Sequence, residues 1–209
     1  MRVETAPEFA QAAAAAVVIL CWLAFAAVFT FRMRGPRPKE RRRERASIIG
    51  IVLQGMSFAC VWCTGRLTFS PITPDHPAIG AILAGLCVPL AVGSIWLTIT
   101  AASVLGKEWS FQARLVEGHR LVTAGPYALV RHPIYTGMFG MLLATGLAFA
   151  HWIAVVPATV LYGAGTIIRV RSEEKLLREA FGRAFEEYAR RVPAVFPGLR
   201  RPSDRRPTP

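Results

Sequence analysis

Two apolar runs decide the fold: IYTGMFGMLLATGLAFA (residues 134–150) and IAVVPATVLYGAGTII (residues 153–168), separated only by His151 and Trp152. Each run is short for an independent membrane span, which usually takes about 20 residues. Because the connection is so brief, the two helices must be antiparallel neighbours, and we predict a helical hairpin. Small residues that allow close helix approach recur along the first run, at Gly137, Gly140 and Gly146.

Three more apolar blocks precede this hairpin: Gln11 to Phe31, Ser47 to Thr64, and Pro77 to Leu105. The first is long enough to cross a hydrocarbon core of about 30 Å. The basic stretch lies after this block and not before it, so we expect a retained span and no cleaved signal peptide. The chain is 53% hydrophobic and only 18% charged, which is typical of a membrane protein. The predicted fold class is therefore all-α, an integral membrane bundle of five transmembrane helices.

The net charge of +12 comes from 25 Lys+Arg against 13 Asp+Glu. Eight basic residues lie between the first two apolar blocks, one in the next connection, four after the third block, none at the hairpin tip and eleven after Ile168. This placement favours topology marking, and we expect no nucleic-acid partner. The positive-inside rule predicts an N-terminus outside the cell and a cytosolic C-terminus. Because arginine greatly outnumbers lysine, as in GC-rich bacterial genomes, we expect a bacterial inner membrane.

The sequence gives no sign of a metal site. Cys60 and Cys63 have the CxxC spacing, but no second pair and no His cluster accompanies them. We interpret them as packing residues within a span and predict no bound metal. The chain also has no GxGxxG motif that would suggest a dinucleotide-binding fold.

The tripeptide Arg131-His132-Pro133 stands at the start of the hairpin. Pro133 suits the first turn of a helix and biases the residue before it away from helical geometry. With Tyr135 close behind, this turn places an arginine, a histidine and a tyrosine at the membrane surface. All three residue types favour that depth, so the tripeptide alone is more typical of an interfacial anchor than of an active site.

A second polar stretch follows the hairpin: RVRSEEKLLREAFGRAFEEYARRVPAVFP (residues 169–197). Apolar residues recur in it at three- and four-residue spacing, which predicts a cytosolic C-terminal amphipathic helix. Glu173 and Glu174 lie at the membrane boundary, where a carboxylate needs a partner or a ligand. Since a hairpin returns the chain to its starting side, we expect Tyr135 and both carboxylates in one pocket. Such a pocket suits a ligand with both charges, hydroxyl groups and a flat ring.

From Leu105 to Pro197 the chain resembles the isoprenylcysteine carboxyl methyltransferase (ICMT) family of integral membrane enzymes. The resemblance rests on the order of LGKEWS (residues 105–110), HRLVTAGPYALVRHPIYTG (residues 119–137), the glutamate pair, and then FG, EY and RVP. It implies transfer of a methyl group from S-adenosyl-L-methionine to a lipophilic acceptor that enters from the bilayer. It also implies a cytosolic cofactor pocket closed by the C-terminal segment.

The resemblance assigns roles to individual residues. Those that it places at the cofactor are Tyr127, Arg131, His132, Tyr135, Glu173, Glu174 and Tyr188. Arg191 would face the reacting end as a catalytic residue, balanced by Glu174, and could orient an acceptor carboxylate by paired hydrogen bonds. A neutral amine or thiol acceptor would instead need a base, so N- and S-methylation stay open beside O-methylation of a carboxylate.

We divide the chain into N-terminal transmembrane helices with a basic cytosolic loop (1–104), an ICMT-like catalytic region (105–198) and a disordered tail (199–209). Membrane lipids are the expected surroundings, and the sequence does not indicate an oligomeric state. Two other functions stay open. One is an NADPH-dependent membrane reductase of the sterol-reductase type, and the other is a non-catalytic membrane protein with the same fold.

Overall fold

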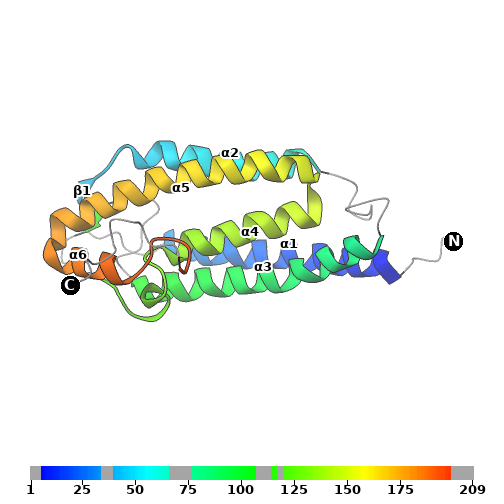
Figure 1. The fold of residues 1–209 in the computed structure, drawn as a ribbon, viewed down its shortest axis with the longest axis horizontal. Helices are drawn as coiled ribbons and strands as arrows, with labels where there is room; N and C mark the ends of the chain where they lie inside the picture. Colours follow the sequence, from blue (N-terminus) through cyan, green and yellow to red (C-terminus); the bar gives the residue numbers. More distant parts are fainter. Residues whose placement is uncertain (1–5, 34–39, 66–76, 107–113, 117–119, 199–209) are drawn as a thin grey trace, which may run out of the picture.

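The computed structural model describes residues 6–33, 40–65, 77–106, 114–116 and 120–198 (Figure 1). Its helices are α1 (Ala6–Met33), α2 (Ser47–Cys63), α3 (Pro77–Leu105), the 3-10 helix η2 (Gly125–Ala128), α4 (Pro133–Phe149), α5 (Trp152–Phe181) and α6 (Arg183–Arg191). The helical class is as predicted, apart from two short strands, β1 (Glu40–Arg43) and β2 (Arg114–Val116), which pair antiparallel. The tail that was predicted to be disordered, residues 199–209, lies outside the described residues.

The helices form an elongated bundle (Figure 1). Helix α5 lies beside α2, while α3 packs against both α1 and α4. Ala150 and His151 connect α4 to α5 at the right-hand end of the view, and α6 and β1 lie at the left-hand end. The start of α4 and the end of α5 therefore reach the same end of the bundle, as the predicted hairpin requires.

Three of the described helices are long and apolar enough to cross a membrane. Their spanning parts are Ala12–Thr30 in α1, Ile82–Leu105 in α3 and Trp152–Phe181, which is all of α5. Helices α2 and α4 are apolar but only 17 residues long, which is about 26 Å at 1.5 Å per residue. Large apolar side chains such as Leu23, Trp96 and Val160 cover the outside of the bundle. Apolar surface on this scale is typical of helices that face lipid.

Helix α5 is longer than its apolar run predicts. The predicted span ends at Ile168 and is followed by a separate amphipathic helix, but α5 continues to Phe181. No proline or glycine lies between these two residues, so the helical hydrogen bonds are not interrupted. Gly182, with φ at 49°, ends α5 and separates it from α6. The expected amphipathic helix is therefore the last part of α5 together with α6.

Helix α4 approaches its neighbours closely at glycines, as predicted. A Cβ atom on Gly137 or on Gly140 would collide with hydroxyl-bearing side chains of α3. A Cβ atom on Gly146 would lie 2.9 Å from the side chain of Val155 in α5. Two of these glycines thus serve the contact of α4 with α3, and one serves the hairpin itself.

Two clusters of buried side chains form the core. One joins α1, α3 and α4, and the other joins α2, α4 and α5. Tyr162 belongs to the second cluster, and its hydroxyl donates a hydrogen bond of 2.8 Å to the backbone carbonyl of Tyr135. Because Tyr135 is in the first turn of α4, this bond fixes α5 against the polar end of the hairpin.

Candidate functional site

The turn before α4 has the geometry that Pro133 predicts. His132 precedes the helix with φ at −127° and ψ at 61°, and Pro133 lies in the first turn. The backbone N–H groups of Arg131 and His132 donate to the carbonyls of Pro193 and Ala194, each at 2.9 Å. These bonds hold the C-terminal segment, residues 192–198, against the turn before α4.

Glu174 is an enclosed carboxylate, with 2% of its side chain exposed. Arg131 donates to its Oε1 from Nε at 3.0 Å and from Nη2 at 2.8 Å, and Arg178 donates to its Oε2 at 3.0 Å. Nε2 of His132 lies 3.4 Å from Oε1. Both oxygens are thus satisfied by protein groups, as a buried charge requires.

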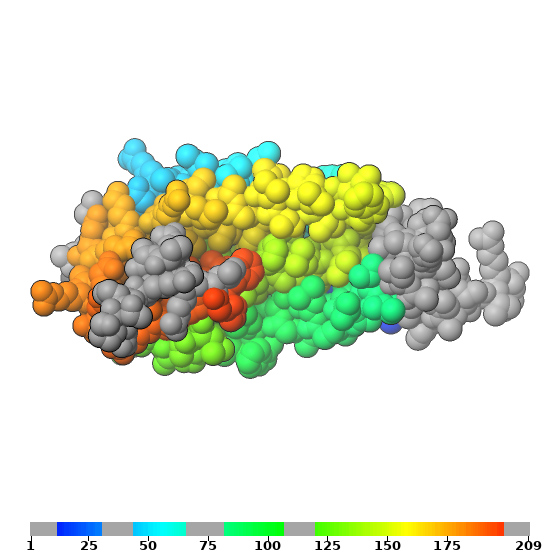
Figure 2. All heavy atoms as spheres, viewed as in Figure 1, coloured from blue at the N-terminus to red at the C-terminus, as the bar shows by residue number. Residues whose placement is uncertain are grey.

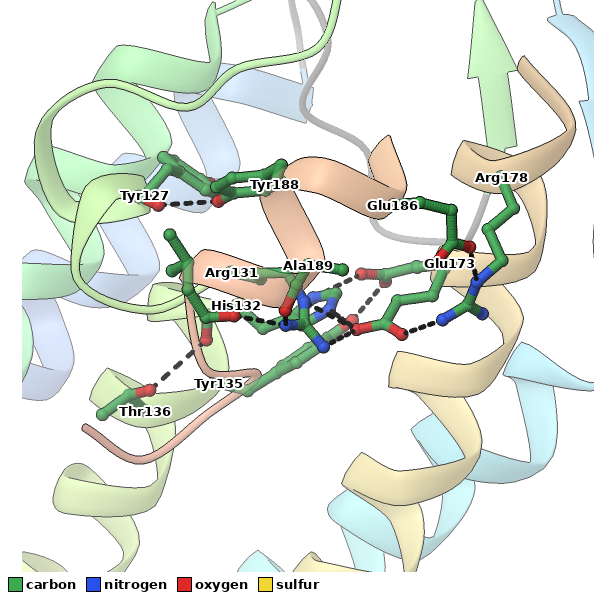
Figure 3. Close-up of polar contacts among 12 residues, drawn as sticks. Tyr127, Arg131, His132, Tyr135, Thr136, Glu173, Arg178, Glu186, Tyr188 and Ala189 are labelled. Carbon is green, nitrogen blue, oxygen red and sulfur yellow. Dashed lines mark hydrogen bonds and ion pairs between the residues drawn. The ribbon is translucent and has the colours of Figure 1, made fainter. Parts of the chain in front are cut away.

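Glu173 is the more open of the two carboxylates, with 25% of its side chain exposed. The Tyr135 hydroxyl donates to its Oε1, and Nδ1 of His132 lies 3.3 Å from its Oε2. Arg169, one helical turn earlier in α5, lies 3.8 Å away. The hairpin therefore brings Tyr135, His132 and Glu173 together at one end of the bundle, as predicted (Figure 3).

His132 and Tyr135 form an aromatic stack beside the carboxylates. Their ring centroids are 5.7 Å apart and their planes differ by 17°. The guanidinium carbon of Arg169 lies 4.9 Å from the centre of the Tyr135 ring, a cation–π contact. The cluster therefore combines a flat ring surface, a buried cation and a partly exposed carboxylate.

The two carboxylates control the protonation of His132. Burial of the imidazole disfavours its charged form, but the hydrogen bonds and charges of Glu173 and Glu174 outweigh burial and raise the pKa of His132 above its ordinary 6.5. In the charged form both ring nitrogens can donate, one toward each carboxylate. In that form His132 holds the two carboxylates side by side.

Arg131 and two tyrosines fix α6 against the turn. Nη1 of Arg131 donates to the backbone carbonyl of Ala189 at 2.8 Å and also to that of Val192. The hydroxyl of Tyr188 donates to the carbonyl of Tyr127 at 2.6 Å, which links α6 to η2. The described partners of the Arg131 guanidinium and the Tyr188 hydroxyl are protein groups, and a contact of Arg131, Tyr127 or Tyr188 with a cofactor stays a prediction.

Arg191 lies on the exposed side of α6. Its side chain is 78% exposed and is 3.9 Å from Glu187, one turn earlier in α6. Arg131 and Arg178 hold the Glu174 carboxylate, and the expected balance between Arg191 and Glu174 stays a prediction. Arg191 lies on the outer face of the last turn of α6, where a cation is favoured by the helix dipole. Its catalytic role stays a prediction.

Arg169 and Arg178 belong to the site but are not predicted from the sequence. Each stands four residues from one of the carboxylates on the same helix, which is the spacing of a helical ion pair. This spacing is informative only when α5 continues past Ile168 as one helix, and the predicted span ends at Ile168. Residues 107–110 of the LGKEWS motif and His119 lie outside the described residues.

The matches to known proteins cover about half of this chain or less. Residues 82–184 match the phospholipid methyltransferase family. Protein-S-isoprenylcysteine O-methyltransferase B of Arabidopsis thaliana is 33% identical over 100 residues, which are 47% of this chain and 51% of the relative. Over about half of its length the chain is therefore similar to an isoprenylcysteine O-methyltransferase. The protein-S-isoprenylcysteine O-methyltransferase of Schizosaccharomyces pombe is 34% identical to it over 79 residues, 38% of this chain and 34% of the relative.

A relative with a different name matches about half of the chain as well. The cobalt-zinc-cadmium resistance protein CzcN of Cupriavidus metallidurans is 35% identical over 118 residues, 53% of this chain and 51% of that protein. The matches therefore span about half the length of these relatives or less. Residues 82–184 include the turn before α4 and both glutamates, but not α2 or Arg191. Together with the three long apolar helices, the similarity to these methyltransferases supports an integral membrane protein.

Proposed function

We propose that this chain is an integral membrane methyltransferase that uses S-adenosyl-L-methionine and acts on a lipophilic acceptor. The observation that carries the proposal is the difference between the two carboxylates. Glu174 is enclosed and satisfied by two arginines, whereas Glu173 keeps 25% of its side chain exposed beside Tyr135. Glu173 can therefore meet a ligand while the ion pairs of Glu174 hold the site together.

The residues of the site fit the chemistry of this cofactor. S-adenosyl-L-methionine brings ammonium and carboxylate groups, ribose hydroxyls, an adenine ring and an already activated methyl group. Glu173 would hold a cationic or hydroxyl group, and the ring pair of His132 and Tyr135 would offer a surface for stacking. The contribution of the protein is then position and electrostatics in a site shielded from water.

An apolar cavity of about 280 Å³ offers a place for the acceptor. It lies between α3 and α4, and its apolar walls include Leu90, Leu97, Phe139, Leu143 and Phe196. Thr136 also lines it, and the hydroxyl of Thr136 donates to the backbone of the C-terminal segment at 2.6 Å. In Figure 2 the red segment that ends at residue 198 lies against α4 and α3. The cavity therefore adjoins the turn that carries the site, which supports an acceptor with an apolar part.

We place O-methylation of a carboxylate first among the acceptor chemistries. Two of the relatives are named for O-methyl transfer to isoprenylcysteine, and the family match over residues 82–184 includes the turn before α4 and both glutamates. For this chain the acceptor needs only an apolar part for the cavity and a reacting group at the polar end of the bundle.

The proposed topology has five spans, an outer N-terminus and a cytosolic site in a bacterial inner membrane, with lipids as partners. The start of α1 lies at one end of the bundle, whereas β1, α6 and the site lie at the other (Figure 1). The connections rich in basic residues flank β1 and α6, so the positive-inside rule favours the site end as cytosolic. The short helices α2 and α4 can cross where the bilayer thins locally.

Calorimetric titration of the purified full chain with S-adenosylhomocysteine and with NADPH tests the proposal. We expect S-adenosylhomocysteine to bind with a Kd of about 1–100 μM and NADPH not to bind. Binding of NADPH alone would favour the reductase of the sterol-reductase type. Binding of neither would favour a non-catalytic membrane protein.

A further inference from the structure

Gln54 is a buried polar residue of α2, with 2% of its surface exposed. Its Nε2 donates to the hydroxyl of Thr166 at 2.9 Å, and its Oε1 accepts from Nη1 of Arg169 at 3.2 Å. Both partners belong to α5, so one amide side chain connects the two helices. A buried amide that is paired in this way holds two helices in one relative position.

Two glycines bring α2 and α5 close enough for this contact. A Cβ atom on Gly50 would lie 2.5 Å from Cγ of Arg169 and 2.7 Å from the carbonyl oxygen of Gly165. A Cβ atom on Gly165 would lie 2.7 Å from the carbonyl oxygen of Gly50 and 3.0 Å from Cγ of Gln54. Any larger residue would push the helices apart, and the stem of Arg169 is therefore held against the backbone of α2.

Arg169 carries this contact into the candidate site. Its guanidinium lies over the ring of Tyr135, 4.9 Å from the centroid, and 3.8 Å from Glu173. The hydroxyl of Tyr135 in turn donates to Glu173. The position of the partly exposed carboxylate thus depends on where the guanidinium stands, and Gln54 is an α2 group that accepts a hydrogen bond from that guanidinium.

We infer that Gln54 is a positioning residue of the site, which holds Arg169 across the face of Tyr135 and beside Glu173. Helix α2 lies outside residues 82–184, so the family match gives it no role. Gln54 acts through Arg169 and does not touch the ligand. The expected effect of Gln54 on ligand binding rests on the proposed function.

Three substitutions and one control test the inference by calorimetry with S-adenosylhomocysteine on the full chain. Gln54→Leu removes the acceptor, Gln54→Asn shortens it out of reach, and Gln54→Glu keeps an oxygen for Arg169. We expect Gln54→Leu and Gln54→Asn to raise the Kd for S-adenosylhomocysteine about tenfold, which is the usual effect of losing a hydrogen bond to a charged group. Gln54→Glu should keep the Kd within about twofold of the wild-type value. The control Thr145→Val removes a different interhelical bond of 2.9 Å, from Trp22, and should leave binding unchanged.

A second measurement needs no ligand. The chain has four tyrosines, so the ring signals of Tyr135 in ¹³C-tyrosine-labelled protein can be assigned from the spectrum of Tyr135→Phe. Gln54→Leu and Gln54→Asn should shift the Tyr135 signals, because the guanidinium leaves the ring face, and should spare those of Tyr188. Gln54→Glu and Thr145→Val should leave Tyr135 unchanged.

The outcomes separate the two proposals. Tyr135 signals that do not respond in any folded Gln54 variant would overturn the inference. The inference would also be overturned if Gln54→Leu bound S-adenosylhomocysteine with wild-type affinity, or if Gln54→Glu lost as much affinity as Gln54→Leu. If the wild-type protein binds no S-adenosylhomocysteine while Tyr135 responds as described, the proposed function fails and the positioning role stands.

Discussion

Arg131 gives two N–H groups to one oxygen of Glu174, Nε at 3.0 Å and Nη2 at 2.8 Å. This pair joins the turn before α4 to α5, and Nη1 of the same guanidinium holds the carbonyl of Ala189 in α6. Three segments therefore meet at one side chain. Both partners are buried, with 6% and 2% of their side chains exposed, so removal of one leaves a buried charge without its main partner.

Loss of Arg131 alone should destabilise the protein by about 3–5 kcal/mol, and simultaneous loss of both charges should cost less. We expect Arg131→Met to lower the thermal midpoint in detergent, and the double variant Arg131→Met/Glu174→Leu to recover part of the loss. Arg190→Met, on the exposed face of α6, serves as the control. Strictly additive losses in the double variant would contradict a direct pair.

His132 should make the folding stability depend on pH. Burial lowers its pKa, but Glu173 and Glu174 outweigh burial and raise it, with Arg131 and Arg169 as the nearby cations. A histidine whose pKa is raised on folding stabilises the folded protein. This stabilisation is complete below the pKa of the unfolded state, about 6.5, and is lost as the pH rises through the pKa of the folded state.

The thermal midpoint of the wild type should therefore exceed that of His132→Gln by more at about pH 6 than at about pH 9. Thr145→Val, which removes no titratable group, provides the control and should differ from the wild type equally at both pH values. A His132→Gln difference that does not change with pH would show that the pKa of His132 is not raised in the folded protein.

Several features of the fold follow from local sequence alone. The block from Pro77 to Leu105 has the predicted bounds, and the two-residue connection after α4 correctly predicts that Tyr135 meets Glu173. Both rest on patterns within a few residues: apolar length in the first case and chain reversal in the second.

Other features depend on contacts between distant segments and cannot be predicted from local patterns. The pairing of β1 with β2 joins segments on either side of two helices. Glu174 pairs with Arg131, while Arg191 is exposed. Both positions depend on how α6 packs after Gly182 ends α5. Likewise, no local pattern marks Gln54, because its partners become neighbours only when α2 packs on α5.

The contact of α3 with α4 should tolerate no side chain at Gly137. A Cβ atom there would meet the Thr98 side chain and lie 2.8 Å from the carbonyl oxygen of Ser94. We expect Gly137→Ala to destabilise the protein by about 1–3 kcal/mol in thermal unfolding. At Gly85 on α3 a Cβ atom meets nothing within 4 Å, so Gly85→Ala should be neutral or stabilising. Similar losses in both variants would contradict the close α3–α4 approach.

Arg191→Ala tests the catalytic role that the family resemblance implies for this exposed residue. Because its side chain is 78% exposed, we expect the thermal midpoint to stay unchanged. Methyl transfer should fall by about tenfold or more if Arg191 contacts the acceptor, as a lost charge-assisted hydrogen bond predicts. Arg190→Ala is the matched control and should retain both stability and activity. Wild-type turnover in Arg191→Ala would remove this residue from the reacting end.

The most direct test of the proposed function is methyl transfer itself. Purified full chain is incubated with methyl-labelled S-adenosyl-L-methionine and a lipid extract of membranes, and label in the organic phase is measured before and after alkaline hydrolysis. We predict a base-labile labelled product from the wild type and a similar amount from Glu179→Gln. Glu173→Gln should yield at least about tenfold less of this product. No labelled product from the wild type, or an equal amount from Glu173→Gln, would contradict a methyltransferase site at Glu173.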